Sequence, residues 1–506
     1  MSMPPVTRVV IFVLLALSLS YAQDNPAQAQ NAENPQAPTP AYGTDNTVPP
    51  TSENPPISGL DVPNLEPHAA PLSYLQLGAH FSESADSNVE NTLGGAGLGS
   101  VTNALGSVDL ERLWSHYDLA LDYLGGAGYY SFADIGIRQI EELGVDQKVT
   151  WKRGQLSVRD AFSYQPEGTF GNAYGSVATL GAGLNESSAF LTGFGLGALG
   201  EVPRIMNISA ADAVENLTPK SALTATVGYG FVHFLDNEPG LSNSFIGNSQ
   251  ITAMAGYDRV LGPHDQGALV YAYQGFSFST GVTFHSHVIQ LMWGHRISGR
   301  MDFLLAAGPQ FTQLLDIPTF EANTSAASIV PPCVPAPTLQ DFSGEDCPAN
   351  ELRISAAGRA ALHYRFPKTL LYASYDHYIT TGAGFFAGAE SDVARLGFSR
   401  PLGRQWSGFG DFGFSRNSRV IPNTCASPNL AFSCPGVNAN VYQYGFAGAG
   451  VRRNLGRNFK VFASYQFDYL SFDNSFCATS GACGRISQRQ IGTIGLDWNP
   501  RPMRID

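Results

Sequence analysis

The residues best suited to chemistry are charged side chains that recur at even spacing within otherwise apolar segments. Arg353, Arg359 and Arg365 lie six residues apart and therefore share one face of an extended strand. Further charged residues occupy the same alternating face of later segments: Asp376, Arg395, Asp411, Asp468, Arg489 and Asp497. Two arrangements fit this pattern. Opposed rows of Arg and Asp would create a transverse field that orients and selects small solutes, whereas neighbouring Arg and Asp would simply pair and fill the space.

Motifs for catalysis or metal binding are weak. The glycines of the segment 195–200 match a dinucleotide-binding pattern, but they follow no buried strand and open no helix, so we interpret them as loop glycines. His285 and His287 share a strand face near a loop, yet no third ligand is identifiable, which favours an interfacial or loop role. A Gly-x-Ser-x-Gly motif is absent. We therefore expect no enzyme, no cofactor and no metal, although a barrel hydrolase could carry its residues on separate strands.

The elements that carry the charged residues alternate strictly between apolar and polar side chains. In the segment 459–469, Phe, Val, Ala and Tyr fall on one face, and Lys460, Ser464, Gln466 and Asp468 fall on the other. Residues 351–366 repeat this plan. A soluble sandwich also alternates, but it does not need the aromatic residues that bracket the apolar face. Such brackets are typical of the two interfaces of a membrane-spanning β-barrel.

The N-terminal 72 residues predict export followed by a tether. Residues 1–22 combine Arg8, a mostly apolar run and a Ser-Tyr-Ala cleavage site, which indicates a signal peptide. Residues 23–72 are rich in Pro, Gln and Asn and predict a disordered periplasmic linker. Beyond the signal peptide no apolar run approaches the ~18 residues of a membrane helix. Residues 73–506 then form the barrel domain. The chain has a mean hydropathy of −0.06, which suits a barrel whose residues face lipid and water alternately.

Eighteen strands are expected in this domain. The predicted ranges are 73–82, 100–113, 115–125, 136–151, 154–165, 204–217, 221–235, 248–261, 267–278, 284–298, 301–315, 351–366, 368–380, 391–401, 405–418, 440–453, 458–472 and 485–499. Tight and long connections alternate, as expected for short periplasmic turns and long external loops. If 204–217 is not a strand, sixteen strands become the better interpretation. The Gly-rich stretch 181–200 is expected to be a loop, either external or folded inward as a constriction.

The six cysteines all follow residue 330 and form three close couples in predicted external loops. The couples are Cys333 with Cys347, Cys425 with Cys434 and Cys477 with Cys483. We interpret them as three local disulfides formed in the oxidising periplasm, because the spacings fit no common zinc pattern. The net charge of −13 argues against nucleic acid as a partner.

Three stretches, 113–123, 154–164 and 494–502, resemble a family of large, uncharacterised bacterial outer-membrane β-barrels. The resemblance covers most of the chain after residue 73 and implies fold and location only. The expected partners are outer-membrane lipid and lipopolysaccharide, the barrel assembly machinery and, in a homo-oligomer, further copies of the chain.

The sequence thus predicts an all-β transmembrane antiparallel barrel of about eighteen strands. Barrels of this size are wide enough for an aqueous channel. The favoured function is porin-like passive diffusion of small polar solutes. The main alternative is a plugged structural or adhesive barrel that displays disulfide-closed surface loops.

Overall fold

The computed structural model describes residues 73–88, 97–131, 136–168, 199–235, 245–316, 352–421, 439–477 and 485–505. The predicted signal peptide, the whole predicted linker and most long loops lie outside these ranges.

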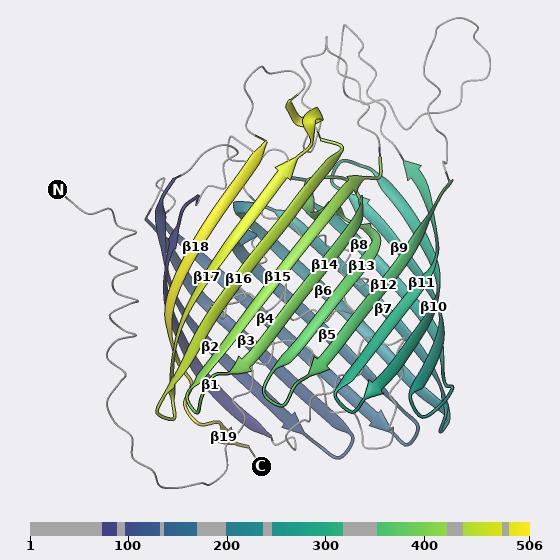
Figure 1. Ribbon diagram of the computed structural model, residues 1–506, viewed down its shortest axis with the longest axis horizontal. Coiled ribbons are helices and arrows are strands. Elements are labelled where there is room, and N and C mark those ends of the chain that lie inside the picture. Colours follow the sequence, from purple (N-terminus) through teal and green to yellow (C-terminus); the bar gives the residue numbers. More distant parts are fainter. Residues whose placement is uncertain are drawn as a thin grey trace, which may run out of the picture. The chain divides into compact units, whose positions relative to one another are not determined.

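Eighteen long strands form one antiparallel sheet, shown from the side in Figure 1. They are β1 (Tyr74–Asp86), β2 (Gly99–Leu113), β3 (Tyr117–Tyr130), β4 (Gly136–Trp151), β5 (Gly154–Gly168), β6 (Leu199–Thr218), β7 (Ser221–Phe234), β8 (Asn248–Val260), β9 (Asp265–Phe278), β10 (Thr283–Ser298), β11 (Met301–Asp316), β12 (Leu352–Arg365), β13 (Leu370–Thr380), β14 (Ala389–Pro401), β15 (Trp406–Arg419), β16 (Val441–Leu455), β17 (Phe459–Phe472) and β18 (Ile486–Trp498). A two-residue strand, β19 (Met503–Arg504), adds to β1. Two short 3-10 helices are described, η3 (Gly382–Gly384) and η4 (Asn474–Cys477).

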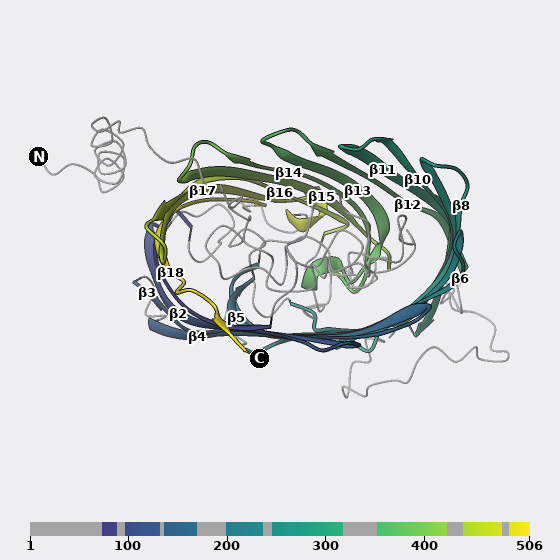
Figure 2. The same cartoon turned by 90° about the horizontal axis from the view of Figure 1, so that it is seen from below.

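The sheet closes on itself. Each strand pairs with the next in sequence, and β1 pairs with β18 from Ala79↔Trp498 to Asp86↔Ile491. Figure 2 shows the strands as a closed ring. The predicted count of eighteen is therefore confirmed, and so is the strand at 204–217, which is the central part of β6.

The two ends of the barrel differ in their connections. Eight turns of two to four residues join β2 to β3, β4 to β5 and each following even strand to the next odd one. These turns share an end with the start of β1 and the end of β18, and we call it the periplasmic end because short turns face the periplasm in such barrels. The longer connections lie at the opposite, outer end.

Burial along each strand is the reverse of that in a soluble protein. On β10, Ile289 and Leu291 are 44% and 69% exposed, whereas Ser286 and Gln290 are 0% and 6% exposed. Apolar side chains therefore cover the outside, whereas the inside carries polar side chains together with buried apolar ones such as Phe284 and Val288. Such a surface is stable only against hydrocarbon.

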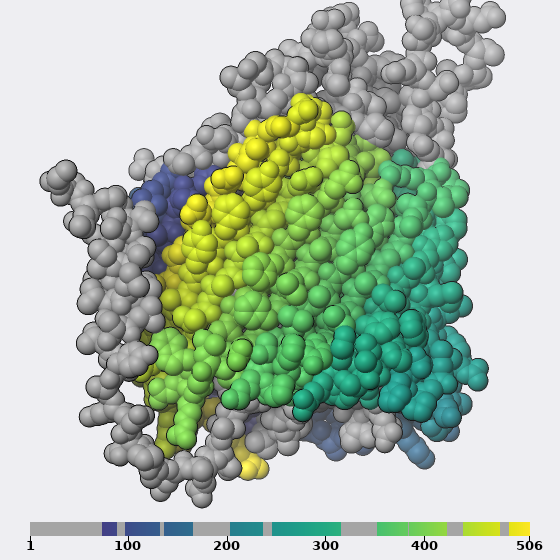
Figure 3. All heavy atoms as spheres, in the orientation of Figure 1, coloured from purple at the N-terminus to yellow at the C-terminus, as the bar shows by residue number. Residues whose placement is uncertain are grey.

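Aromatic side chains bracket this apolar outer surface, part of which is visible in Figure 3 as the continuous wall of β10 to β18. Those near the periplasmic end include Trp114, Trp151, Trp293, Phe366, Phe459 and Trp498, and those toward the outer end include Tyr129, Tyr229, Tyr375 and Phe414. They occupy the positions of the interfacial girdles.

Candidate functional site: the barrel interior

Most of the charged residues predicted to line the interior are buried or half-buried on the inward side of the wall. Arg359, Asp376, Asp468, Arg489 and Asp497 are each less than 9% exposed. Arg395 and Asp411 are also shielded, with side chains 16% and 14% exposed. Arg353 is more open, at 39% of its side chain.

Two ion pairs join neighbouring strands of this wall. Arg359 on β12 lies opposite Asp376 on β13, with Nε 3.4 Å from Oδ1. Arg395 on β14 donates from Nη2 to Oδ2 of Asp411 on β15, at 2.8 Å. This is the arrangement expected if the charges pair along one wall rather than face each other across the lumen.

A third charged group lies where the barrel closes. Arg489 on β18 donates from Nε to Oδ2 of Asp86 on β1 at 2.6 Å, and its Nη2 contacts the same oxygen. Asp468 stands opposite Arg489 in the β17–β18 register and accepts hydrogen bonds from Gln466 at 2.7 Å and Tyr444 at 3.1 Å. Asp86 was not predicted, because its role depends on the contact between the first and last strands.

A fourth pair lies nearer the periplasmic end of the same junction. His80 on β1 and Asp497 on β18 are directly opposite, with Nδ1 2.5 Å from Oδ1. The His80 ring also stacks on Phe462, with centroids 5.6 Å apart. Both side chains are buried, so this pair helps to hold the closing strands together.

The other two predicted arginines lie at opposite ends of β12. Arg353, at the outer end, contacts Glu390 of β14. Arg365 is the last residue of β12 beside a periplasmic turn, and its backbone nitrogen donates to the carbonyl of Arg300 at 2.7 Å. Arg353, Arg359 and Arg365 are therefore spread along the strand rather than gathered at one level.

The most distinctive interior feature is the connection between β13 and β14, residues 381–388, which we call the inner tip. It begins at the outer end but turns into the ring, where Figure 2 shows it in green. The carbonyl of Gly384 accepts a hydrogen bond from the nitrogen of Ile246, just before β8, at 2.8 Å. The carbonyl of Gly388 accepts one from Val420, just after β15, at 3.3 Å. The inner tip thus connects parts of the wall that are far apart in strand order.

Phe385 and Phe386 anchor the inner tip in an aromatic cluster. They are 1% and 0% exposed. Phe385 makes edge contacts with Tyr442 of β16 and Phe472 of β17, at centroid distances of 5.1 and 5.3 Å, and it also contacts Phe245 at 5.5 Å. Aromatic pairs in this geometry stabilise each other beyond simple burial. The cluster therefore fixes the inner tip inside the outer half of the barrel.

Three glycines make the path of the inner tip possible. Gly382, Gly384 and Gly388 have φ values of 74°, 85° and 87°, which are strained for other residues. A Cβ at Gly384 would lie 2.8 Å from the Phe234 ring, and one at Gly388 would lie 2.6 Å from the Phe284 ring. Small residues are needed at these two positions for both backbone and packing reasons.

The alternation of apolar and polar residues does not predict the inner tip, because Phe385 and Phe386 are adjacent and break this pattern. The available signal was the spacing of the glycines around the Phe-Phe pair, as this pattern lets a chain turn tightly while it buries two large rings.

The two histidines of the segment 285–287 face outward on β10 and are capped by tyrosines. His285 Nδ1 lies 2.6 Å from the hydroxyl of Tyr273, and His287 Nδ1 lies 2.8 Å from that of Tyr271. This agrees with the interfacial role expected for the pair. Across the described ranges, no group of three or more His, Cys, Asp or Glu side chains is placed to hold a metal ion.

Several predictions fall outside the described residues. Five of the six cysteines do so, and of Cys477 only the backbone position at the end of η4 is described, so the three disulfides stay predictions. The Gly-rich stretch 181–200 is described only from Leu199, where β6 begins. None of the helices in the described ranges is long and apolar enough to cross a membrane.

Comparison with known proteins gives structural neighbours only. No protein-family model matches the chain, and no curated protein matches its sequence. Pseudomonas aeruginosa OccK2 (OpdF) has 8% identity and a TM-score of 0.39 over 84% of this chain and 98% of its own. Acinetobacter baumannii OccAB2 has 9% identity and a TM-score of 0.38 over 85% and 98%. The ferric-catecholate import receptor Fiu of E. coli K12 has 7% identity and a TM-score of 0.40 over 86% and 82%.

Neighbours this distant assign no substrate to the chain, and its class follows from its own architecture. The strands close into one antiparallel ring, the outer surface is apolar between aromatic girdles, and the inner wall is charged. Together these features identify the chain as a bacterial outer-membrane β-barrel.

Proposed function

We propose that this barrel is a porin-like channel for passive diffusion of small polar solutes across the outer membrane. Its size is the first support, because eighteen strands enclose a lumen wide enough for water. The charged inner wall is the second, because buried Arg and Asp are stable where water or polar solutes accompany them.

The observation that carries the proposal is the inner tip. A segment that enters from the outer end and is anchored on one part of the wall narrows a lumen of this width without replacing its charged lining. The aromatic cluster lies against β7, β14, β16 and β17, whereas Asp86, Arg489, Asp146 and Arg159 belong to the wall from β18 to β5. We therefore propose that solutes pass on the β18-to-β5 side of the lumen, away from the aromatic cluster.

The leading alternative is a plugged structural or adhesive barrel. It draws on the same inner tip, because the cluster around Phe385 and Phe386 is tightly packed. Under that alternative the outer loops would be the functional part. A barrel hydrolase is the third hypothesis, and no observation on the described residues favours it.

Liposome swelling separates these functions. Proteoliposomes containing the full barrel are diluted into isotonic solutions of neutral sugars and amino acids of increasing size. A diffusion channel gives swelling rates that fall steadily with solute size. The absence of swelling with every solute, from protein that shows the heat-modifiable mobility of a folded barrel, would support the plugged alternative.

Contacts with outer-membrane lipid, lipopolysaccharide and the assembly machinery are part of the same proposal, and so is the formation of a homo-oligomer. Half-buried polar residues near the outer end, which include His377 and Asp392, stand where lipid headgroups are expected.

A further inference from the structure

The ladder between β12 and β13 is shorter than the strands that form it. It runs from Arg365↔Leu370 to Gly358↔His377 and then stops. β12 continues to Leu352 and stays paired with β11, while β13 continues to Thr380 and stays paired with β14. In the described part of the wall, no ladder pair joins residues 352–357 to the end of β13. We call this break in the wall the seam.

The seam exists because β13 leaves the wall there to lead into the inner tip. By alternation, Ile379 should point outward with Tyr375 and His377. Instead it is 1% exposed and packs in a cluster with Phe284 and Leu314, whose side chains come from the inner faces of β10 and β11. The chain has therefore crossed from the wall to the interior between His377 and Ile379.

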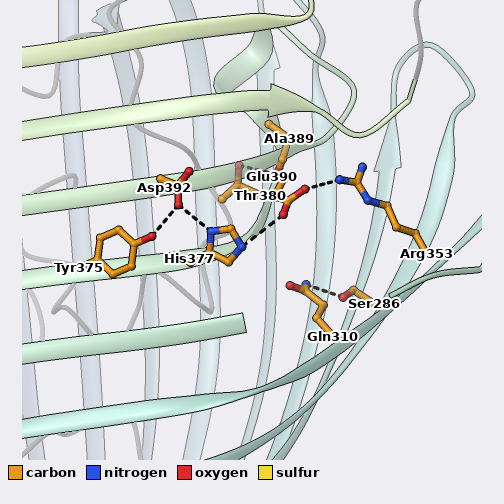
Figure 4. A network of polar contacts seen from close by, with 9 residues as sticks. All are labelled: Ser286, Gln310, Arg353, Tyr375, His377, Thr380, Ala389, Glu390 and Asp392. Carbon is orange, nitrogen blue, oxygen red and sulfur yellow. Dashed lines mark hydrogen bonds and ion pairs between the residues drawn. The ribbon is translucent and has the colours of Figure 1, made fainter. Parts of the chain in front are cut away.

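A chain of polar contacts spans the seam (Figure 4). Arg353 of β12 reaches past β13 to contact Glu390 of β14. His377 lies between the two carboxylates of β14, with Nε2 3.3 Å from Glu390 Oε1 and Nδ1 2.7 Å from Asp392 Oδ1. The Tyr375 hydroxyl donates to Asp392 at 2.7 Å. We call these five residues the latch.

The lipid side of the seam is apolar, and inside it an apolar cluster lies beside polar side chains of β10 and β11, among them Ser286 and Gln310. Leu352 and Ile354, on the β12 edge, are 59% and 64% exposed, as expected for lipid-facing residues. Directly inside lies the cluster of Ile379, Phe276, Phe284 and Leu314. Between these two apolar regions stands the latch, whose charged groups suit the level of lipid headgroups.

The seam is also the place where the wall can part at the least cost. Separating any fully paired strands within the bilayer breaks backbone hydrogen bonds that no water can replace. At the seam no ladder must break. The Arg353–Glu390 contact, the packing of Tyr378 on Ala357 and the packing of Ile379 on Phe284 and Leu314 oppose the parting of β12 from β13.

We propose that the seam is a lateral opening through which a single-chain amphiphile passes between the outer leaflet and the barrel interior. The polar head would be held at the latch, and the apolar body would lie against the cluster around Ile379. This activity is additional to polar-solute diffusion and does not depend on it.

Labelling of a buried cysteine from the lipid phase tests the opening. Two variants are prepared in liposomes: Ile379→Cys alone, and Ile379→Cys combined with Glu390→Gln. Both are exposed to N-pyrenylmaleimide, which partitions into the bilayer. We expect Glu390→Gln to speed labelling about tenfold, which corresponds to about 1.4 kcal/mol of latch stability. Submicellar lauryldimethylamine oxide should slow the labelling, because it occupies the same path.

The matched control is Leu269→Cys on β9, a lipid-facing position of 53% exposure. Its labelling rate should be the same with Glu390 and with Glu390→Gln. An unchanged rate at position 379 on loss of the latch, or faster labelling there by a water-soluble maleimide, would overturn the proposal. If the Glu390→Gln variant does not fold, Arg353→Gln is used in its place, because it breaks the same contact from β12. Neither readout requires conductance, so failure here is distinct from failure of the channel.

Discussion

Arg489 and Asp86 form a buried ion pair across the junction of the last and first strands, although 403 residues separate them in sequence. The two side chains are 2% and 1% exposed. The pair stands beside Asp468, so the junction holds two carboxylates around one guanidinium. Barrel closure thus includes a buried charge pair in addition to the backbone ladder of β1 and β18.

Replacing Arg489 should therefore destabilise the folded barrel. Arg489→Gln leaves Asp86 and Asp468 buried without their cation, and loss of one partner of a buried pair costs about 3–5 kcal/mol. Urea titration of the barrel in lipid vesicles, followed by heat-modifiable mobility, measures the change. The control is Arg416→Gln on β15, which removes the same charge from an exposed position. Equal urea midpoints for the two variants would contradict this account of closure.

The apolar outer surface makes a second prediction. Leu291→Arg places a charge on the lipid-facing side of β10, where the cost near the bilayer midplane is about 2–4 kcal/mol. Leu402→Arg is the matched control, because Leu402 is 59% exposed but lies in the periplasmic turn 402–405. Folding yields in lipid vesicles should fall for Leu291→Arg alone. A similar loss for both variants would argue against hydrocarbon contact at Leu291.

The inner tip should be sensitive to a single methyl group. Gly384→Ala combines a strained φ of 85° with a clash against Phe234, and strain at such a position costs about 1–3 kcal/mol. We expect the inner tip to loosen and single-channel conductance to rise while the barrel stays folded. Gly456→Ala carries similar strain, with a φ of 73° in a periplasmic turn and open space around it, so its conductance should match that of the parent. Identical conductance of the two variants would mean that the inner tip does not form the constriction.

Ion selectivity should respond to the paired arginines. Arg359→Ala with Arg395→Ala removes two positive charges and leaves Asp376 and Asp411 without these partners. The inner wall becomes more negative, so reversal potentials in a salt gradient should shift toward cation selectivity. Asp376→Asn with Asp411→Asn should shift them the other way. Unchanged potentials in both double variants would remove these pairs from the conduction path.

The strands were predictable because alternation is a local property. Each strand carries its own apolar and polar faces, so even β6, the least certain one, could be recognised without knowledge of its neighbours. The strand boundaries were less predictable. For example, β3 continues to Tyr130 through glycines that interrupt the pattern near residue 125.

The interior was less predictable because it depends on register and on irregular backbone. Alternation places Arg359 and Asp376 on the inward face, but only the β12–β13 register makes them partners. Asp86 needs the closing register as well. The seam arises because Ile379, which alternation assigns to the lipid side, is drawn inside by the inner tip.

Single-channel recording in planar bilayers tests the central claim most directly. The parent barrel should give steady ohmic current steps, and Phe385→Ala with Phe386→Ala should give larger steps because the anchors of the inner tip are lost. Silence from folded parent protein, with current appearing only in the double variant, would contradict an open channel and indicate a plugged barrel.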